Sequence, residues 1–148
     1  MIEVNNLTRS KVSEAFLKKV AEMVLKGELA LRKLKGKQKD TILSVALVSQ
    51  KKAAELNKKY RKKDKVANVL SFPVGNDKIL SGVEGGLGEI VLCPSQIKKE
   101  AKKYGMIFEQ ALAWMFVHGI LHLLGYDHIK AGGAKRMEQK ERMYLSRI

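Results

Sequence analysis

The sequence has little of what extracellular and membrane proteins need. A single cysteine, Cys93, excludes an intramolecular disulfide framework. The longest nearly apolar stretch, Ala111 to Leu124, is shorter than the roughly 20 residues that a helix needs to span a bilayer. The opening segment, MIEVNNLTRS, lacks the apolar centre of a signal peptide. We therefore expect a soluble, cytoplasmic protein that does not bind a membrane.

Acidic residues are also scarce. The 148 residues include 15 Asp and Glu but 29 Lys and Arg, which gives a formal net charge of +14. Such an excess attracts polyanions, of which nucleic acid is the commonest, and a merely solvated basic surface is the alternative. Apolar residues make up 45% of the chain, enough for one buried core, and neither a repeat nor a linker divides it. The sequence predicts one globular domain over residues 1–148.

Hydrophobic spacing predicts a mixture of strands and helices. Short segments rich in β-branched and apolar residues predict strands at 2–4, 41–48, 66–72 and 87–93. Helical periodicity predicts helices at 10–27, 49–59, 94–103, 108–124 and 134–148. Ser10 is the expected cap of the first helix, and Pro94 the expected first residue of the third. The order predicts an α+β fold, with a small mixed four-stranded sheet covered by about five helices.

All three histidines lie in one segment, VHGILHLLGYDH, which ends at His128. His118 and His122 are four residues apart, a rotation of about 400° on a helix, so both imidazoles share one face. Gly125 can adopt the left-handed conformation that ends a helix, and the turn can bring His128 to the same cation. The alternative is a set of core histidines, but this helix offers them no other strongly polar partner. The segment predicts a metal site of His118, His122 and His128 at the end of a central helix.

The spacing of these histidines, H-x-x-x-H-x-x-G-x-x-H, is that of the metzincin zinc site with one difference. Metzincins carry a general-base Glu after the first histidine, where this chain has Gly119. Three neutral nitrogens with an open fourth position suit a catalytic Zn²⁺. The pattern predicts one zinc ion and a substrate other than a peptide, although another divalent metal could occupy such a site.

Three motifs together resemble the YbeY family of bacterial metal-dependent endoribonucleases. They are the segment from His118 to His128, the segment LNKKYR (56–61) followed by VLSFP (69–73), and the segment LGEIVLC (87–93). The resemblance implies an α+β fold, a zinc ion on the three histidines and cleavage of single-stranded RNA in maturing the 3′ end of 16S ribosomal RNA. It also implies a part in ribosome quality control, with the small ribosomal subunit and a ribosome-associated GTPase as partners. One departure is Ala67-Asn68, where the family usually has Thr-Asp.

Two further residues are expected to take part in catalysis. Arg61 matches the family's functional arginine, and a fixed guanidinium can offset the charge that develops on a phosphoryl group. A solvated arginine among lysines is the alternative. Asp127 precedes the third histidine and can orient a ligand, act as a base or cap the turn.

Other residues near the motifs have plainer expected roles. Ser71 either faces a cleft from the end of its strand or is an ordinary strand serine. Cys93 is expected to be a small buried apolar residue rather than a fourth ligand. Trp114, Met115 and Phe116 are expected in the core, not on a platform that stacks bases.

The resulting hypothesis is a zinc-dependent endoribonuclease that acts on ribosomal RNA precursors. One rival is a zinc peptidase, which the metzincin spacing favours and Gly119 opposes. The other rival is a ribosome-assembly factor without catalytic activity, whose zinc is structural. The identity of the general base and of the nucleophile stays open.

Overall fold

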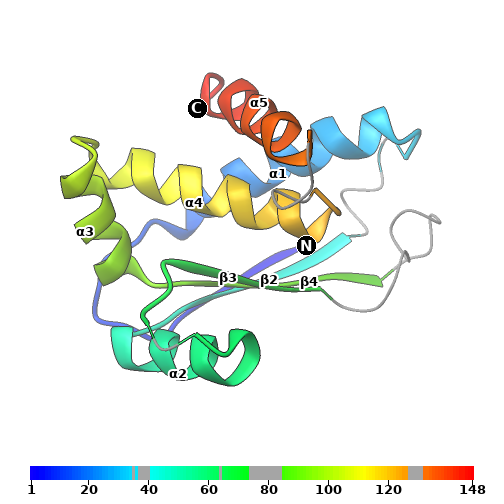
Figure 1. The fold of residues 1–148 in the computed structure, drawn as a ribbon. Coiled ribbons are helices and arrows are strands. Elements are labelled where there is room, and N and C mark those ends of the chain that lie inside the picture. The colour runs from blue at the N-terminus through cyan, green and yellow to red at the C-terminus, as the bar shows by residue number, and fades with distance from the viewer. Residues whose placement is uncertain (35, 37–40, 64, 74–84, 127–131) are drawn as a thin grey trace.

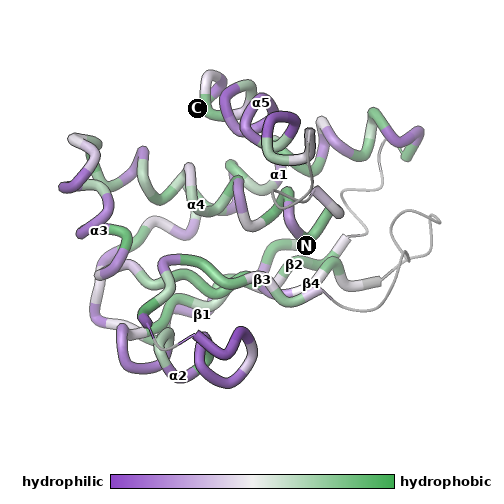
Figure 2. The backbone as a smooth tube through the Cα atoms, viewed as in Figure 1, coloured by the Kyte–Doolittle hydropathy of each residue, from purple (hydrophilic) through white to green (hydrophobic). Residues whose placement is uncertain are grey.

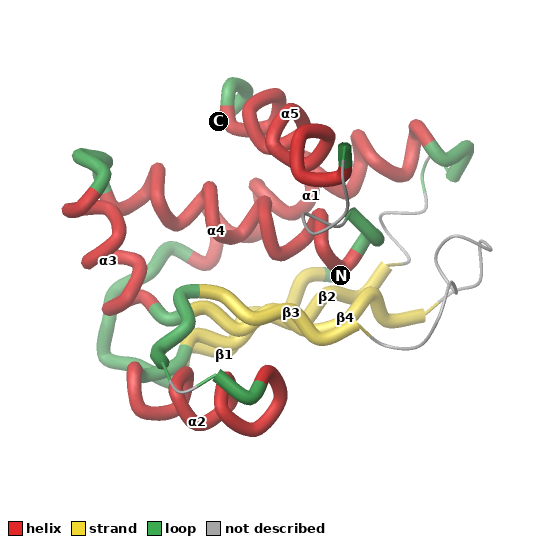
Figure 3. The backbone as a smooth tube through the Cα atoms, viewed as in Figure 1, coloured by secondary structure: helices red, strands yellow, loops and turns green. Residues whose placement is uncertain are grey.

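The sheet has three parallel strands and one antiparallel edge strand. A computed structural model describes residues 1–34, 36, 41–63, 65–73, 85–126 and 132–148. The strands β1 (Ile2–Asn6), β2 (Thr41–Leu47), β3 (Val69–Pro73) and β4 (Gly85–Leu92) lie in the order β1-β2-β4-β3. β1 and β2, and β2 and β4, pair in parallel, whereas β3 pairs antiparallel with β4 (Figure 3). The predicted mixed four-stranded sheet is confirmed.

Five helices cover this sheet from two sides. They are α1 (Glu14–Leu31), α2 (Gln50–Arg61), α3 (Pro94–Lys103), α4 (Phe108–Leu123) and α5 (Gly133–Leu145). Figure 1 shows α2 alone on one side of the sheet, with α4 and α1 on the other side and α5 beyond them. α4 contacts β3 and β4, and α1, α3 and α5 each pack against it. The helix that carries two of the histidines is therefore the centre of the larger layer.

The core has two parts because helices cover both faces of the sheet. The larger part joins α4 to the sheet and to α1, through fully buried side chains such as Phe116, Ile120 and Leu25. The smaller part lies under α2 and contains Val91, Leu70 and Cys93. Cys93 is 1% exposed, as expected of a small apolar residue. In Figure 2 most of α4 has the green colour of hydrophobic residues, whereas α2 is mostly purple, the colour of hydrophilic residues.

The structure corrects the predicted bounds of the first helix. Ser13, not Ser10, caps α1, and its hydroxyl accepts a hydrogen bond from the Phe16 amide at 3.1 Å. Ser10 is held in the preceding loop, where its carbonyl accepts from the Asn6 side chain. The helix also continues past Gly27 to Leu31, so this glycine does not end it. Its role is to leave room for Tyr144, because a Cβ at Gly27 would lie 2.6 Å from the Tyr144 hydroxyl. β3 likewise begins at Val69 rather than Val66.

No single helix in the described ranges is long and apolar enough to cross a membrane. Only α3 and α4 taken together, bent by 112° at the break between them, pass a test of length and composition. In this structure α4 is mostly buried against the sheet and the other helices.

Candidate metal centre and cleft

One stripe of α4 is open while the rest of its central part is buried. From Ala111 to His122, every residue of this fully described segment is buried except Trp114, His118 and His122. These three are spaced four apart, so they follow one another along one face. The two imidazole rings have their centroids 4.7 Å apart, at 76° to each other. The structure therefore brings His118 and His122 together as the spacing predicts.

A carboxylate from α5 holds the His118 ring. Glu141 Oε1 lies 2.5 Å from His118 Nδ1, and Glu141 Oε2 accepts a hydrogen bond from the indole of Trp114 at 3.3 Å. The Glu141 residue is only 9% exposed. The polar partner that α4 does not offer its histidines thus comes from another helix, α5. A carboxylate on one imidazole nitrogen fixes the orientation of the ring and favours a metal at the other nitrogen.

The end of α4 has the geometry that Gly125 predicts. Gly125 has φ +98°, in the left-handed region. Its amide donates to the His122 carbonyl at 3.0 Å, and the Tyr126 amide donates to the Leu121 carbonyl at 3.0 Å. This pair of bonds is a Schellman motif, which reverses the chain after a helix. Asp127 and His128, which follow directly, lie outside the described residues.

Two nitrogen ligands of the predicted metal site are thus described. Within the described ranges no group of three His, Cys, Asp or Glu is placed to hold a metal ion. The two imidazoles and the carboxylate on His118 still fit zinc, which takes imidazole nitrogens and commonly has a carboxylate behind them.

Gly119 faces the sheet and not the open stripe. A Cβ at this position would lie 3.2 Å from Ser71 Oγ, 3.2 Å from Val69 Cγ2 and 3.3 Å from Ile90 Cδ1. The hydroxyl of Ser71 also donates to the Gly119 carbonyl at 3.1 Å. The helix therefore approaches β3 and β4 so closely that a Glu in this position has no room.

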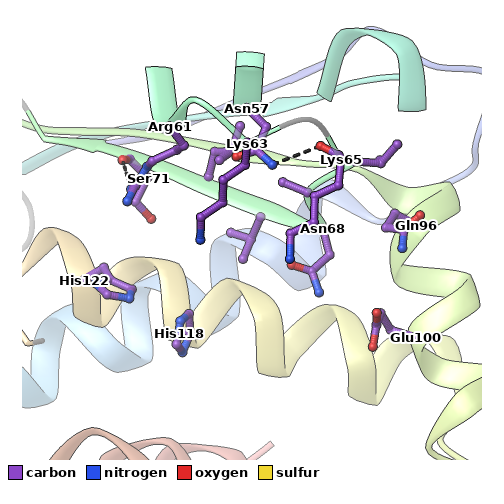
Figure 4. Close-up of a pocket in the computed structure, with 14 residues that line it drawn as sticks. Asn57, Arg61, Lys63, Lys65, Asn68, Ser71, Gln96, Glu100, His118 and His122 are labelled. Carbon is purple, nitrogen blue, oxygen red and sulfur yellow. Dashed lines mark hydrogen bonds between the residues drawn. The ribbon is translucent and has the colours of Figure 1, made fainter. Parts of the chain in front are cut away.

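A cleft of about 570 Å³ connects the histidines with the end of α2. Arg61, the last residue of α2, lines it together with His118 and His122 (Figure 4). The Arg61 guanidinium donates to the Ser71 carbonyl at 3.4 Å, which ties it to the edge strand β3. Ser71 also lines the cleft, so its side chain has a place at the site. The structure thus brings Arg61 to the predicted ligands.

The turn after α2 is held by a residue that the sequence analysis did not single out. Asn57 is 3% exposed, and its side-chain amide donates to the Lys65 carbonyl at 2.9 Å. Its own carbonyl accepts from the amide of Lys62, which closes the helix in the left-handed conformation at φ +55°. Lys63 and Lys65 then line the cleft beside Arg61. Asn57 thereby places the basic turn over the histidines.

The family is decided by comparison with known proteins. The model of the family described as Endoribonuclease YbeY matches residues 3–148. The chain belongs to the YbeY family. This confirms the resemblance seen in the three motifs.

Individual members of the YbeY family agree over most of the chain. A relative from Staphylococcus carnosus, named Endoribonuclease YbeY, is 39% identical over 111 residues, covering 72% of this chain and 71% of that protein. One from Pseudomonas putida (KT2440), with the same name, is 40% identical over 121 residues, covering 82% and 74%. The solution structure of TM1509 from Thermotoga maritima has a TM-score of 0.62 and 27% identity, and covers 99% of this chain and 87% of that one.

Ala67 and Asn68, the two positions at which the sequence departs from the expected pattern, both line the cleft. The carboxylate that the cleft does present among the described residues is Glu100, from α3. Glu141 was the residue most clearly missed by the sequence analysis. A sequence pattern could have indicated it, because Glu141 shares the apolar face of its helix with Met137 and Tyr144. A carboxylate buried on such a face needs hydrogen-bond partners.

A second buried carboxylate lies just behind the end of α4. Glu28 of α1 is fully buried and accepts hydrogen bonds from Tyr126 at 2.5 Å, from Tyr144, and from Lys140 at 3.2 Å. Burial alone would raise the pKa of Glu28, but the three donors and the Lys140 charge outweigh it and hold the pKa below its usual value. Burial, followed by the bond to Glu28, raises the pKa of Tyr126. The network ties the turn after α4 to two other helices.

Proposed function

We propose that this YbeY family member is a zinc-dependent endoribonuclease that cleaves single-stranded RNA in ribosomal RNA processing. Family membership supports the class of reaction. The observation that carries the proposal is the convergence of His118, His122 and Arg61 on one cleft. A metal held by such side chains and a guanidinium can both stabilise the negative charge that develops in phosphodiester hydrolysis.

Each group of cleft residues has a different role in such a reaction. His118, His122 and His128 would hold the zinc, which when bound supplies Lewis acidity and lowers the pKa of a water molecule. Arg61 donates hydrogen bonds to the phosphoryl oxygens as negative charge builds on them. Lys63 and Lys65 attract the RNA backbone without regard to sequence. Glu141 keeps the His118 ring in place.

The test compares cleavage of precursor ribosomal RNA by Arg61→Ala, His118→Ala and the unchanged protein. Arg61→Ala should lower kcat/KM about 10²- to 10³-fold, because one preorganised donor to the developing charge is lost. His118→Ala should in addition lose zinc, measured by metal analysis of the purified protein. Arg61→Lys should recover only part of the activity, because an ammonium cannot form the paired bonds.

Lys58→Ala is the matched control for Arg61→Ala. Lys58 is exposed on the same helix and does not line the cleft. Its loss should leave kcat/KM within about threefold of the unchanged protein, since a single exposed charge contributes little. Circular dichroism should show all variants folded. Full cleavage by folded Arg61→Ala and His118→Ala would overturn the proposal.

A zinc peptidase is the less suitable alternative. Gly119 takes the place of the general base, and its surroundings leave no space for one. The cleft also presents Arg61, Lys63 and Lys65, which suit a polyanion better than a neutral peptide. Zinc-dependent cleavage of a peptide library would nonetheless restore this alternative.

A structural zinc in a non-catalytic assembly factor is the second alternative. Removal of the metal with a chelator distinguishes it from the proposal. A catalytic zinc predicts lost cleavage with the fold retained, whereas a structural zinc predicts lost folding and no separable loss of cleavage. Metal analysis also identifies the ion, because affinity and availability together decide which divalent metal binds.

The biological setting that we propose follows the resemblance noted in the sequence. The substrate is the 3′ end of 16S ribosomal RNA, and the protein also acts in ribosome quality control in the cytoplasm. The small ribosomal subunit and a ribosome-associated GTPase are its proposed partners. Precursor 16S RNA accumulating in cells that carry only Arg61→Ala would support this setting.

A further inference from the structure

A second pocket adjoins the cleft at His118. This side pocket has a volume of about 490 Å³ and lies between α4 and α5. It shares His118, Asn68 and Val69 with the cleft. Trp114, one turn before His118 on the open stripe of α4, lines the side pocket but not the cleft. The expectation that Trp114 belongs to the core is therefore wrong in part, although Met115 and Phe116 are buried as expected.

The two pockets have opposite chemistry. The cleft presents three cations, Arg61, Lys63 and Lys65, among its described residues. The side pocket presents two carboxylates, Glu138 and Glu141, beside a mainly apolar lining. That lining consists of Val69, Trp114, Met115, Ala134 and Met137. The cleft also holds one carboxylate, Glu100, but its three cations outnumber it, so it suits a phosphate better than the side pocket does.

A single strand of RNA has two parts that match this division. Its phosphates fit the basic cleft, and its bases are flat, uncharged and largely apolar on their faces. Aromatic side chains such as Trp stack bases in single-strand binding proteins. In a duplex the bases are already stacked and paired, so entry into a pocket costs the energy of unstacking and unpairing.

We propose that the side pocket binds one nucleobase next to the phosphate held in the cleft, with Trp114 as its stacking surface. The inference rests on the proposed function and adds the reason for acting on single strands. The Trp114 indole donates to Glu141, and Glu141 in turn holds His118. A base on Trp114 is therefore positioned relative to the imidazole that would bind the metal.

The single tryptophan of the chain makes the test direct. Intrinsic Trp fluorescence comes from Trp114 alone, because it is the protein's one indole, and Trp114 lines the side pocket. The zinc-loaded protein is titrated with oligoadenosine and with a ribose-phosphate oligomer of the same length and charge that carries no bases. Oligoadenosine should quench the fluorescence to saturation and bind about tenfold more tightly, the scale of one stacked base. Gel electrophoresis afterwards reports whether either oligomer was cleaved, and affinities are compared only from titrations in which both remain intact.

A pair of variants on α5 separates the side pocket from the rest of the surface. Ala134 is exposed and lines the side pocket, so Ala134→Leu should partly fill it. We expect about fivefold weaker binding of oligoadenosine, a loss of part of one stacked base, and no change for the oligomer without bases. Gln139→Leu is the control, because Gln139 is exposed on the same helix and does not line the side pocket.

Three outcomes are distinguishable. Quenching by oligoadenosine only, weakened by Ala134→Leu and not by Gln139→Leu, supports the base pocket. RNA that is bound and cleaved with no change in Trp fluorescence, or with equal binding of both oligomers, overturns the base pocket and leaves the nuclease proposal intact. An unchanged protein that neither binds nor cleaves RNA contradicts the proposed function itself.

Discussion

Gly119 excludes, at the scale of one residue, the general base that a metzincin-like site would use. A helix-interior glycine costs about 1 kcal/mol relative to alanine, and here the cost is offset by close packing on the sheet. The neighbours of a Cβ at this position are Ser71 on the edge strand and Ile90 in the buried core, both within 3.3 Å. A metzincin-like Glu would place a carboxylate against these residues instead of beside the histidines.

Gly119→Glu should therefore destabilise the protein and give no peptidase activity. We expect the free energy of unfolding to fall by at least about 3 kcal/mol, from overpacking and from a buried unpaired charge. Urea denaturation measures this loss, and Gln139→Glu on the exposed part of α5 provides a control for the added charge. A stable Gly119→Glu protein that hydrolyses peptides would contradict this prediction and would mean that α4 can move away from the sheet.

At the scale of elements, the carboxylate of Glu28 joins α1, α5 and the turn after α4. Glu28→Gln should lower the free energy of unfolding by about 2 kcal/mol, because buried charged hydrogen bonds are lost. Glu22→Gln, exposed on the same helix, should change it by less than about 0.5 kcal/mol. Equal effects of the two substitutions in thermal or urea denaturation would contradict the role of the network.

The same network predicts a pH dependence with a definite sign. The pKa of Glu28 in the folded protein is below its usual value of 4.5, so its stabilising effect is complete above that pH and disappears as the pH falls through the folded pKa. The difference in free energy of unfolding between the unchanged protein and Glu28→Gln should shrink below about pH 4.5. Urea denaturation across this range checks it, and a difference that grows on acidification would reverse the sign.

Elements with local signals could be predicted from the sequence, and contacts between distant elements could not. The four-residue spacing of His118 and His122 and the left-handed Gly125 depend on neighbouring residues only, so both were predictable. Glu28 meets Tyr126 across 98 residues, and Glu141 meets His118 across 23. Each was visible beforehand only as a carboxylate on the apolar face of a helix. The partner of such a carboxylate is fixed by tertiary packing, which periodicity does not report.

The whole molecule carries a net charge of +14, and the placement of the charge matters more than its sum. The helix α2 and the basic turn that follows it lie across the sheet from α1 (Figure 1). Cations on α1 and cations near the end of α2 therefore lie on different sides of the molecule. Three of them, Arg61, Lys63 and Lys65, line the cleft. Charge alone favoured nucleic-acid binding, with a solvated basic surface as the alternative, and the three cations in the cleft add support to the first.

Binding of single-stranded RNA should therefore weaken with salt in proportion to the few cations that line the cleft. Each phosphate neutralised on a single strand contributes about −0.7 to the slope of log K against log salt, so three give about −2. Between 50 and 200 mM salt the affinity should fall about twentyfold on that slope. Lys63→Gln should reduce the slope by about 0.7, whereas Lys18→Gln, exposed on α1, should leave it unchanged. Equal changes in slope from both variants would mean that RNA responds to the overall charge of the protein. They would contradict binding of the RNA backbone in the cleft.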